Sequence, residues 1–203
     1  MKLRKKGLRL EIEPAAAVML TALLLTDRTG LCLAALLGAG IHEAGHIVAA
    51  KLLKIPVRAL RFHLLGAGLE PGGRLLSYGE EFLLCAAGPL CSLLCAAAPA
   101  ALWGKSLFLR QFSCVSLTLG LLNLLPVRGF DGGRMLEAAL LPALGIRACG
   151  NIITASSLVL LFLLWAVAVY FLLRTGDGLS LWCFSMSLFS RFFSVMKSEN
   201  SGG

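Results

Sequence analysis

Residues 31–53 read LCLAALLGAGIHEAGHIVAAKLL, an apolar run that contains the pattern His42-Glu43-Ala44-Gly45-His46. The run is long enough for a membrane-spanning helix, which needs about 20 predominantly apolar residues. On a helix the two histidines are four positions apart, so both imidazoles lie on one face and can bind one metal ion. Glu43 adjoins that face and can accept a proton from a metal-bound water without being a ligand.

Ionisable residues inside a membrane span are costly and therefore mark a functional site by default. The structural alternative is that the two histidines are buried and are satisfied by hydrogen bonds to the backbone or to a neighbouring helix.

The rest of the chain is also strongly apolar. Of its 203 residues 58% are hydrophobic and 15% are charged, and its mean hydropathy is +0.83, far from the composition of an average soluble domain. The sequence predicts an all-α polytopic membrane protein with about six transmembrane helices. The expected spans are 14–26, 31–53, 82–103, 107–125, 152–173 and 179–195. Serines interrupt the last span, for which an interfacial amphipathic helix is the alternative.

The basic residues indicate one orientation in the membrane. With the N-terminus in the cytoplasm, 15 of the 19 Lys and Arg residues lie on the cytoplasmic side, as the positive-inside rule requires. We therefore expect a multi-pass protein with both termini in the cytoplasm. Anionic lipid headgroups account for the net charge of +8, so membrane lipid is an expected partner and nucleic acid is not. No small-residue cleavage site follows residues 15–25, which favours an uncleaved first span.

The chain has seven cysteines and no Cys-x-x-Cys pair. Because nearly all of them fall within apolar runs, we interpret them as buried, unreactive thiols, and not as a disulfide or zinc-cysteine framework. No internal repeat is present. The sequence predicts a single domain over 1–203, with its core at 31–134 and C-terminal helices at 150–196.

A candidate third metal ligand lies in the segment 123–134, which reads NLLPVRGFDGGR. Pro126 should end the preceding apolar helix, and the glycines let the chain bend back. Asp131 could then reach a metal ion held at membrane depth, where irregular backbone is tolerated if it lines a watery cavity. An ordinary turn aspartate before glycine is the alternative for this residue.

The connection between the second and third expected spans has the pattern of a small β-hairpin. Apolar Leu60 and Phe62 alternate with Arg61 and His63, and a Pro-Gly-Gly turn follows at 71–73, as is typical of strands and turns. Such a hairpin at the cytoplasmic surface could hold an unwound peptide by β-augmentation. A basic connector that anchors to headgroups is the alternative.

The two motifs together resemble the site-2 protease family of zinc-dependent intramembrane metalloproteases. The positions that match the family pattern are His42, Glu43, His46, Asn123, Pro126, Asp131 and Gly132. The resemblance implies one Zn²⁺ per subunit, held by the histidines and Asp131, with Glu43 as the catalytic base. It also implies contacts with the substrate or the ligands for Asn123, Pro126 and Gly132. His63 is the next ligand candidate after Asp131.

Within that family, the early His-Glu-x-x-His and the Asn-Leu-Leu-Pro segment resemble the stage IV sporulation protein FB branch. The branch implies a bacterial cell membrane, specifically the mother-cell membrane around the forespore. It also implies a membrane-associated sigma-factor precursor as substrate, and inhibitory membrane partners. The chain departs from the family at Ser92, where Gly-Pro-x-x-Asn is common. We expect neither a PDZ domain nor a nucleotide-sensing domain.

Three other functions remain open from the sequence. The nearest is a general regulated-intramembrane-proteolysis enzyme that acts on anti-sigma factors or signal-peptide remnants. A non-catalytic zinc-bearing membrane scaffold is another, although it would not need Glu43. A metal transporter is the third, and it predicts acidic residues or histidines in several other spans, which the sequence lacks.

Overall fold

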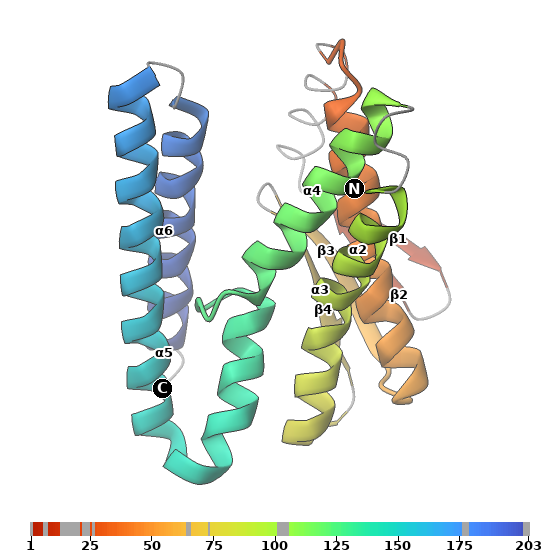
Figure 1. Ribbon diagram of the computed structural model, residues 1–203. Helices are drawn as coiled ribbons and strands as arrows, with labels where there is room; N and C mark the ends of the chain where they lie inside the picture. The colour runs from red at the N-terminus through yellow and green to blue at the C-terminus, as the bar shows by residue number, and fades with distance from the viewer. Residues whose placement is uncertain are drawn as a thin grey trace. The chain divides into compact units, whose positions relative to one another are not determined.

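The computed structural model describes residues 2–5, 8–12, 21, 25, 27–63, 66–72, 74–100, 106–175 and 179–200. In chain order its elements are β1 (Lys2–Lys5), β2 (Leu8–Ile12), α2 (Leu31–Leu52), β3 (Val57–His63), β4 (Gly66–Pro71), α3 (Tyr78–Ala100), α4 (Leu107–Leu124), α5 (Asp131–Thr175) and α6 (Leu179–Asn200) (Figure 1). The chain divides into two compact units, Met1–Asn123 and Leu124–Gly203, and each is described by itself.

Four of the described helices are long and apolar enough to cross a membrane: Leu31–Leu52, Tyr78–Ala97, Leu107–Leu124 and Asp131–Thr175. The prediction of about six spans is therefore not supported in full. The expected span 14–26 lies outside the described residues apart from two positions. The segment 179–200 is helical but does not qualify as a span, because its serines and C-terminal polar residues lower its hydropathy.

The first unit also contains a four-stranded sheet in the order β1-β2-β3-β4. Strands β3 and β4 pair antiparallel, with Leu60 opposite Leu69, in the region where the sequence predicts a hairpin. Strand β2 pairs parallel with β3, and β1 pairs antiparallel with β2. The turn expected at 71–73 was wrong, since β4 runs to Pro71 and its pairing partner β3 precedes it. The basic N-terminal segment, for which no strand was expected, adds β1 and β2 to the sheet.

Polar side chains fix the start of α2. Asp27 accepts hydrogen bonds from the backbone N–H groups of Thr29 (2.9 Å), Gly30 (3.1 Å) and Cys32 (2.6 Å). These N–H groups lower the pKa of the Asp27 carboxyl to about 2, because they stabilise its charged form. A carboxylate near a helix N-terminus also interacts favourably with the helix dipole.

A reciprocal capping box begins α3. Glu80 Oε2 accepts the Ser77 N–H at 2.9 Å, and Ser77 Oγ accepts the Glu80 N–H at 3.3 Å, so two otherwise unsatisfied donors are paired. Arg74 donates two hydrogen bonds to the same carboxylate, at 2.8 and 2.6 Å. These contacts explain why the helix begins four residues before the expected start at Phe82.

In the second unit, a short connection leads from α4 into α5. Pro126 and Gly129 (φ +93°) turn the chain, and two serines of α5 hold it. Ser156 donates to the Pro126 carbonyl at 2.8 Å, and Ser157 accepts the Arg128 N–H at 2.7 Å. Helix α5 continues to Thr175 and contains a non-helical residue at Gly145 (φ +73°), where two helices are joined at a kink.

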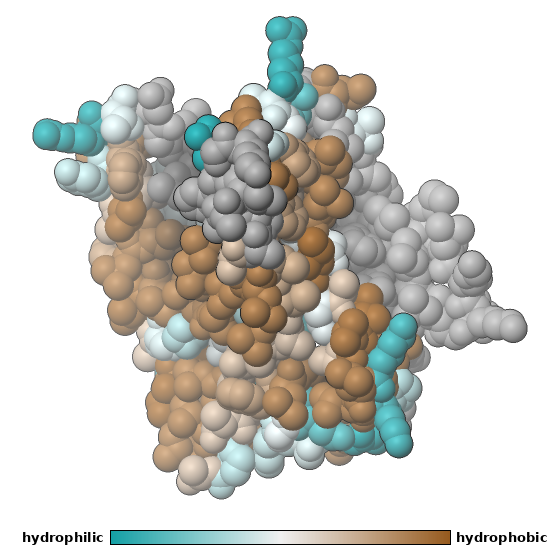
Figure 2. Space-filling model, turned by 45° about the vertical axis from the view of Figure 1, so that its right-hand side comes forward, coloured by the Kyte–Doolittle hydropathy of each residue, from teal (hydrophilic) through white to brown (hydrophobic). Residues whose placement is uncertain are grey.

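Large apolar side chains cover much of the described surface, including Leu90 and Leu94 of α3 and Phe162 and Leu163 of α5. On the face shown in Figure 2, brown hydrophobic residues predominate and teal residues occur in small groups. In a soluble monomer such patches are rare, whereas lipid chains would cover them in a membrane.

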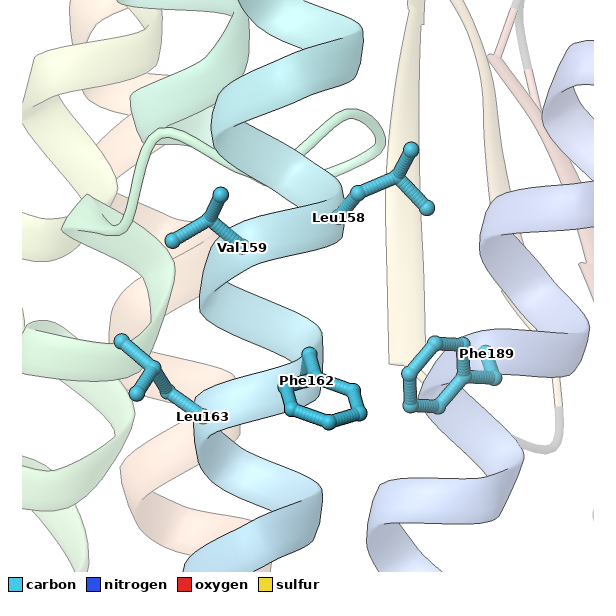
Figure 3. A pocket seen from close by; sticks show the side chains of 5 residues that line it. All are labelled: Leu158, Val159, Phe162, Leu163 and Phe189. Atoms are coloured by element: carbon cyan, nitrogen blue, oxygen red, sulfur yellow. The ribbon is translucent and has the colours of Figure 1, made fainter.

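A shallow groove in the second unit is lined by Leu158, Val159, Phe162, Leu163 and Phe189 (Figure 3). The side chains of Phe162 on α5 and Phe189 on α6 project toward each other there. All five of these lining side chains are apolar.

Candidate metal centre

The two histidines of the His-Glu-x-x-His motif lie on the buried face of α2. That face repeats every three to four residues and includes Ala34, Gly38, His42, Gly45, His46 and Ala50. The side chains of His42 and His46 are only 5% and 7% exposed. Burial of two imidazoles inside an apolar helix pair requires that their ring nitrogens have partners.

The Nε2 atoms of the two rings point to a common location. They lie 3.2 Å apart. Two nitrogens bound tetrahedrally to one zinc ion, each at about 2.05 Å, are separated by about 3.3 Å. The observed separation therefore fits a shared metal ion, and it would also fit a hydrogen bond between the rings.

The opposite nitrogens of both rings are held by helix α3. His46 Nδ1 lies 2.8 Å from the Leu84 carbonyl oxygen, and His42 Nδ1 lies 3.0 Å from Ser92 Oγ. A carbonyl only accepts hydrogen bonds, so His46 carries its proton on Nδ1 and presents the lone pair of Nε2. This is the usual arrangement around metal-binding histidines, whose second nitrogen donates to a carbonyl or another acceptor.

Two glycines make room for the site between α2 and α3. A Cβ atom at Gly45 would lie 2.6 Å from the Ala87 carbonyl oxygen, so a side chain there would force the helices apart. A Cβ at Gly88 would lie 2.9 Å from His42 Nε2 and closer still to His46 Nε2. The missing side chain of Gly88 thus lets both imidazole rings pack closely against α3.

Glu43 follows His42 on α2 and is half-buried. It lies beside the histidine face, in an apolar span where Lys51 is the only acidic or basic residue besides Glu43 and the two histidines. A carboxylate in this place is the type of group that moves protons at a metal-bound water.

Asp131 belongs to the second unit and is the first residue of α5. The sequence analysis placed it on a turn, and this detail was wrong, because Gly132 and Gly133 continue the helix. Both glycines are buried, and a Cβ at either would collide with carbonyls of the preceding segment, those of Leu124 and Val127 respectively. Asp131 offers one carboxylate oxygen as a ligand, and its joining the two imidazole nitrogens on one metal ion remains a prediction from the sequence motif.

The other predicted site residues have local structural contacts. Asn123 donates from Nδ2 to the Leu119 carbonyl of its own helix at 3.0 Å, and the Pro126 carbonyl accepts from Ser156. Gly132 packs against the Leu124 and Leu125 carbonyls. His63 ends strand β3. Contacts of Asn123, Pro126 and Gly132 with a substrate remain predictions.

Two residues of the site were not recognised from the sequence. Ser92 was noted only as a departure from the family pattern, and Gly88 was not assigned a role, although the dipeptide Gly88-Pro89 inside an apolar helix was a signal for close backbone approach. Neither contact with the histidines follows from spacing along the chain, because strands β3 and β4 lie between α2 and α3 in the sequence.

The sequence matches no known family model and no curated protein. Among solved structures, the chain is similar to the site-2 protease from Methanocaldococcus jannaschii, with 20% sequence identity and a TM-score of 0.63. The similarity covers 93% of this chain and 91% of that one. The protein therefore shares the fold of a solved site-2 protease along nearly its whole length.

Proposed function

We propose that the protein is an intramembrane zinc metalloendopeptidase, with one zinc ion held by His42, His46 and Asp131. The observation that carries this proposal is the pair of Nε2 atoms 3.2 Å apart, with each Nδ1 held by α3 and both rings packed closely against Gly88. The pair lies inside a helix that is long and apolar enough to span a membrane. The His-Glu-x-x-His motif and the shared fold support the same conclusion.

When bound, zinc supplies polarisation of a water molecule and of the scissile carbonyl. Glu43 takes the proton from the attacking water and returns it to the nitrogen of the leaving amine. His42 and His46 stay neutral and hold their positions through the Nδ1 contacts. Asp131 contributes a negative charge that partly balances the dication, which two neutral imidazoles cannot do.

A membrane-associated protein is the proposed substrate. In a transmembrane helix the backbone hydrogen bonds hide the scissile carbonyl, so the substrate must unwind before cleavage. Strand β4 lies at the end of the described strand order, with β3 as its partner. An unwound peptide can add to such an edge through main-chain hydrogen bonds.

The motif resemblance favours cleavage of a sigma-factor precursor during sporulation, from a bacterial membrane and with both termini of the protease in the cytoplasm. General regulated proteolysis of anti-sigma factors or signal-peptide remnants uses the same site and is the second candidate. Co-expression with a sigma-factor precursor, and separately with an anti-sigma factor, distinguishes them by the substrate that is shortened.

The mechanism is tested by Glu43→Gln, which keeps the size of the side chain but cannot accept a proton at neutral pH. We expect cleavage of the co-expressed substrate to fall by at least about 1,000-fold, while zinc content after purification stays unchanged. Glu137→Gln, at an exposed glutamate of α5, is the matched control and should cleave normally. Cleavage by the Glu43 variant at a near wild-type rate would refute the proposed mechanism.

A further inference from the structure

The two histidines differ in what holds their Nδ1 atoms. The partner of His46 is a backbone carbonyl, that of Leu84, at 2.8 Å. The partner of His42 is the Ser92 hydroxyl, at 3.0 Å. A side-chain substitution cannot remove the first contact, whereas it can remove the second. The Nδ1 contact of His42 can therefore be removed by one substitution, whereas that of His46 cannot.

The hydroxyl can act as donor or acceptor, and the geometry of the rings decides between them. If both Nε2 lone pairs are directed to one metal ion, the proton of each neutral imidazole must be on Nδ1. Ser92 Oγ then accepts the hydrogen bond from His42 Nδ1–H. Ser92 is fully buried, at 0% exposure, so bulk water cannot replace its hydroxyl if the side chain is shortened.

We propose that Ser92 is a positioning residue, which holds the His42 ring in the tautomer and the orientation that bind zinc; this inference rests on the proposed function. A residue of this kind does not touch the metal or the substrate. It acts on the metal ion through the basicity and the placement of His42 Nε2, and loss of such partners commonly weakens metal binding about 10- to 100-fold.

The experiment measures Zn²⁺ affinity of the full-length purified protein by competition with a chelator, and the visible absorption of the Co²⁺-substituted protein. Ser92→Ala should weaken Zn²⁺ binding about 10- to 100-fold and change the Co²⁺ spectrum. Ser92→Thr keeps the hydroxyl and should restore both within a few-fold. Ser113→Ala is the matched control, because Ser113 is 1% exposed and its hydroxyl has no hydrogen-bond partner among the described residues.

A chelator-resistant Ser92→Ala protein with a wild-type Co²⁺ spectrum would overturn the inference, provided that His42→Ala loses the metal. Equal weakening by Ser113→Ala would also overturn it, because general loosening would then explain the effect. Retention of zinc by His42→Ala would refute the proposed metal centre itself. If the alanine variant does not purify in folded form, Ser92→Cys replaces it, because a thiol fills the space and accepts hydrogen bonds weakly.

Discussion

Gly88 offers a sharp test of where the metal ion binds. In Gly88→Ala, the new Cβ would lie 2.9 Å from His42 Nε2 and closer to His46 Nε2. Ordinary contact begins at about 3.5 Å, so His42 must retreat by about 0.6 Å and His46 by more. Metal sites require ligand distances within about 0.2 Å.

We expect Gly88→Ala to weaken Zn²⁺ binding by more than about 100-fold, the upper end of what loss of one supporting contact costs. Zinc affinity of the purified protein, measured by chelator competition, is the assay. Two glycines serve as matched controls: Gly79 on α3 and Gly40 on α2, since a Cβ at either would meet nothing within 4 Å. Their alanine variants should bind zinc normally.

Helix propensity works in the opposite direction, because alanine stabilises a helix interior over glycine by about 1 kcal/mol. Loss of zinc in Gly88→Ala alone would therefore reflect displacement of the two imidazole rings. Wild-type zinc affinity in a folded Gly88→Ala protein would show that the metal is not bound beside the two Nε2 atoms, and the reasoning from Gly88 would fail.

Two further predictions concern acidic residues. Asp131→Asn keeps a residue that is favourable at the start of a helix but removes the negative charge. Zinc content and cleavage should therefore both be lost while the fold stays intact. Retention of both would place the third ligand elsewhere, with His63 the next candidate. The folded-state pKa of Asp27, about 2, lies below the ordinary 3.8, so its stabilising effect is present above pH 4 and disappears as the pH falls through 2. Thermal unfolding should thus show Asp27→Asn less stable than wild type at pH 7 and close to it at pH 2, where most of the difference is lost, and a gap as large at pH 2 as at pH 7 would contradict this assignment.

The sequence predicted the membrane class, the helices α2, α3 and α4, and the histidine pair, because each of them depends on a local pattern. Helix α4, for example, was expected at 107–125 and is found at Leu107–Leu124. The errors arose where distant segments pair. Strands β1 and β2 were missed because a short basic segment has no strand signal of its own and is ordered by pairing with β3. The helical start of α5 was read as a turn, since two glycines normally interrupt helices.

For the site, the sequence alone determined that His42 and His46 share a helix face and that Glu43 adjoins it, because helical periodicity fixes the directions of neighbouring side chains. Only the tertiary structure decided how the rings are oriented. Helix α3 supplies the Leu84 carbonyl, the Ser92 hydroxyl and the close approach at Gly88. These contacts depend on the register between two packed helices, which spacing along one chain segment does not specify. Buried polar groups need partners, and in this protein the fold supplies them from residues that lie about 40 to 50 positions away in the sequence.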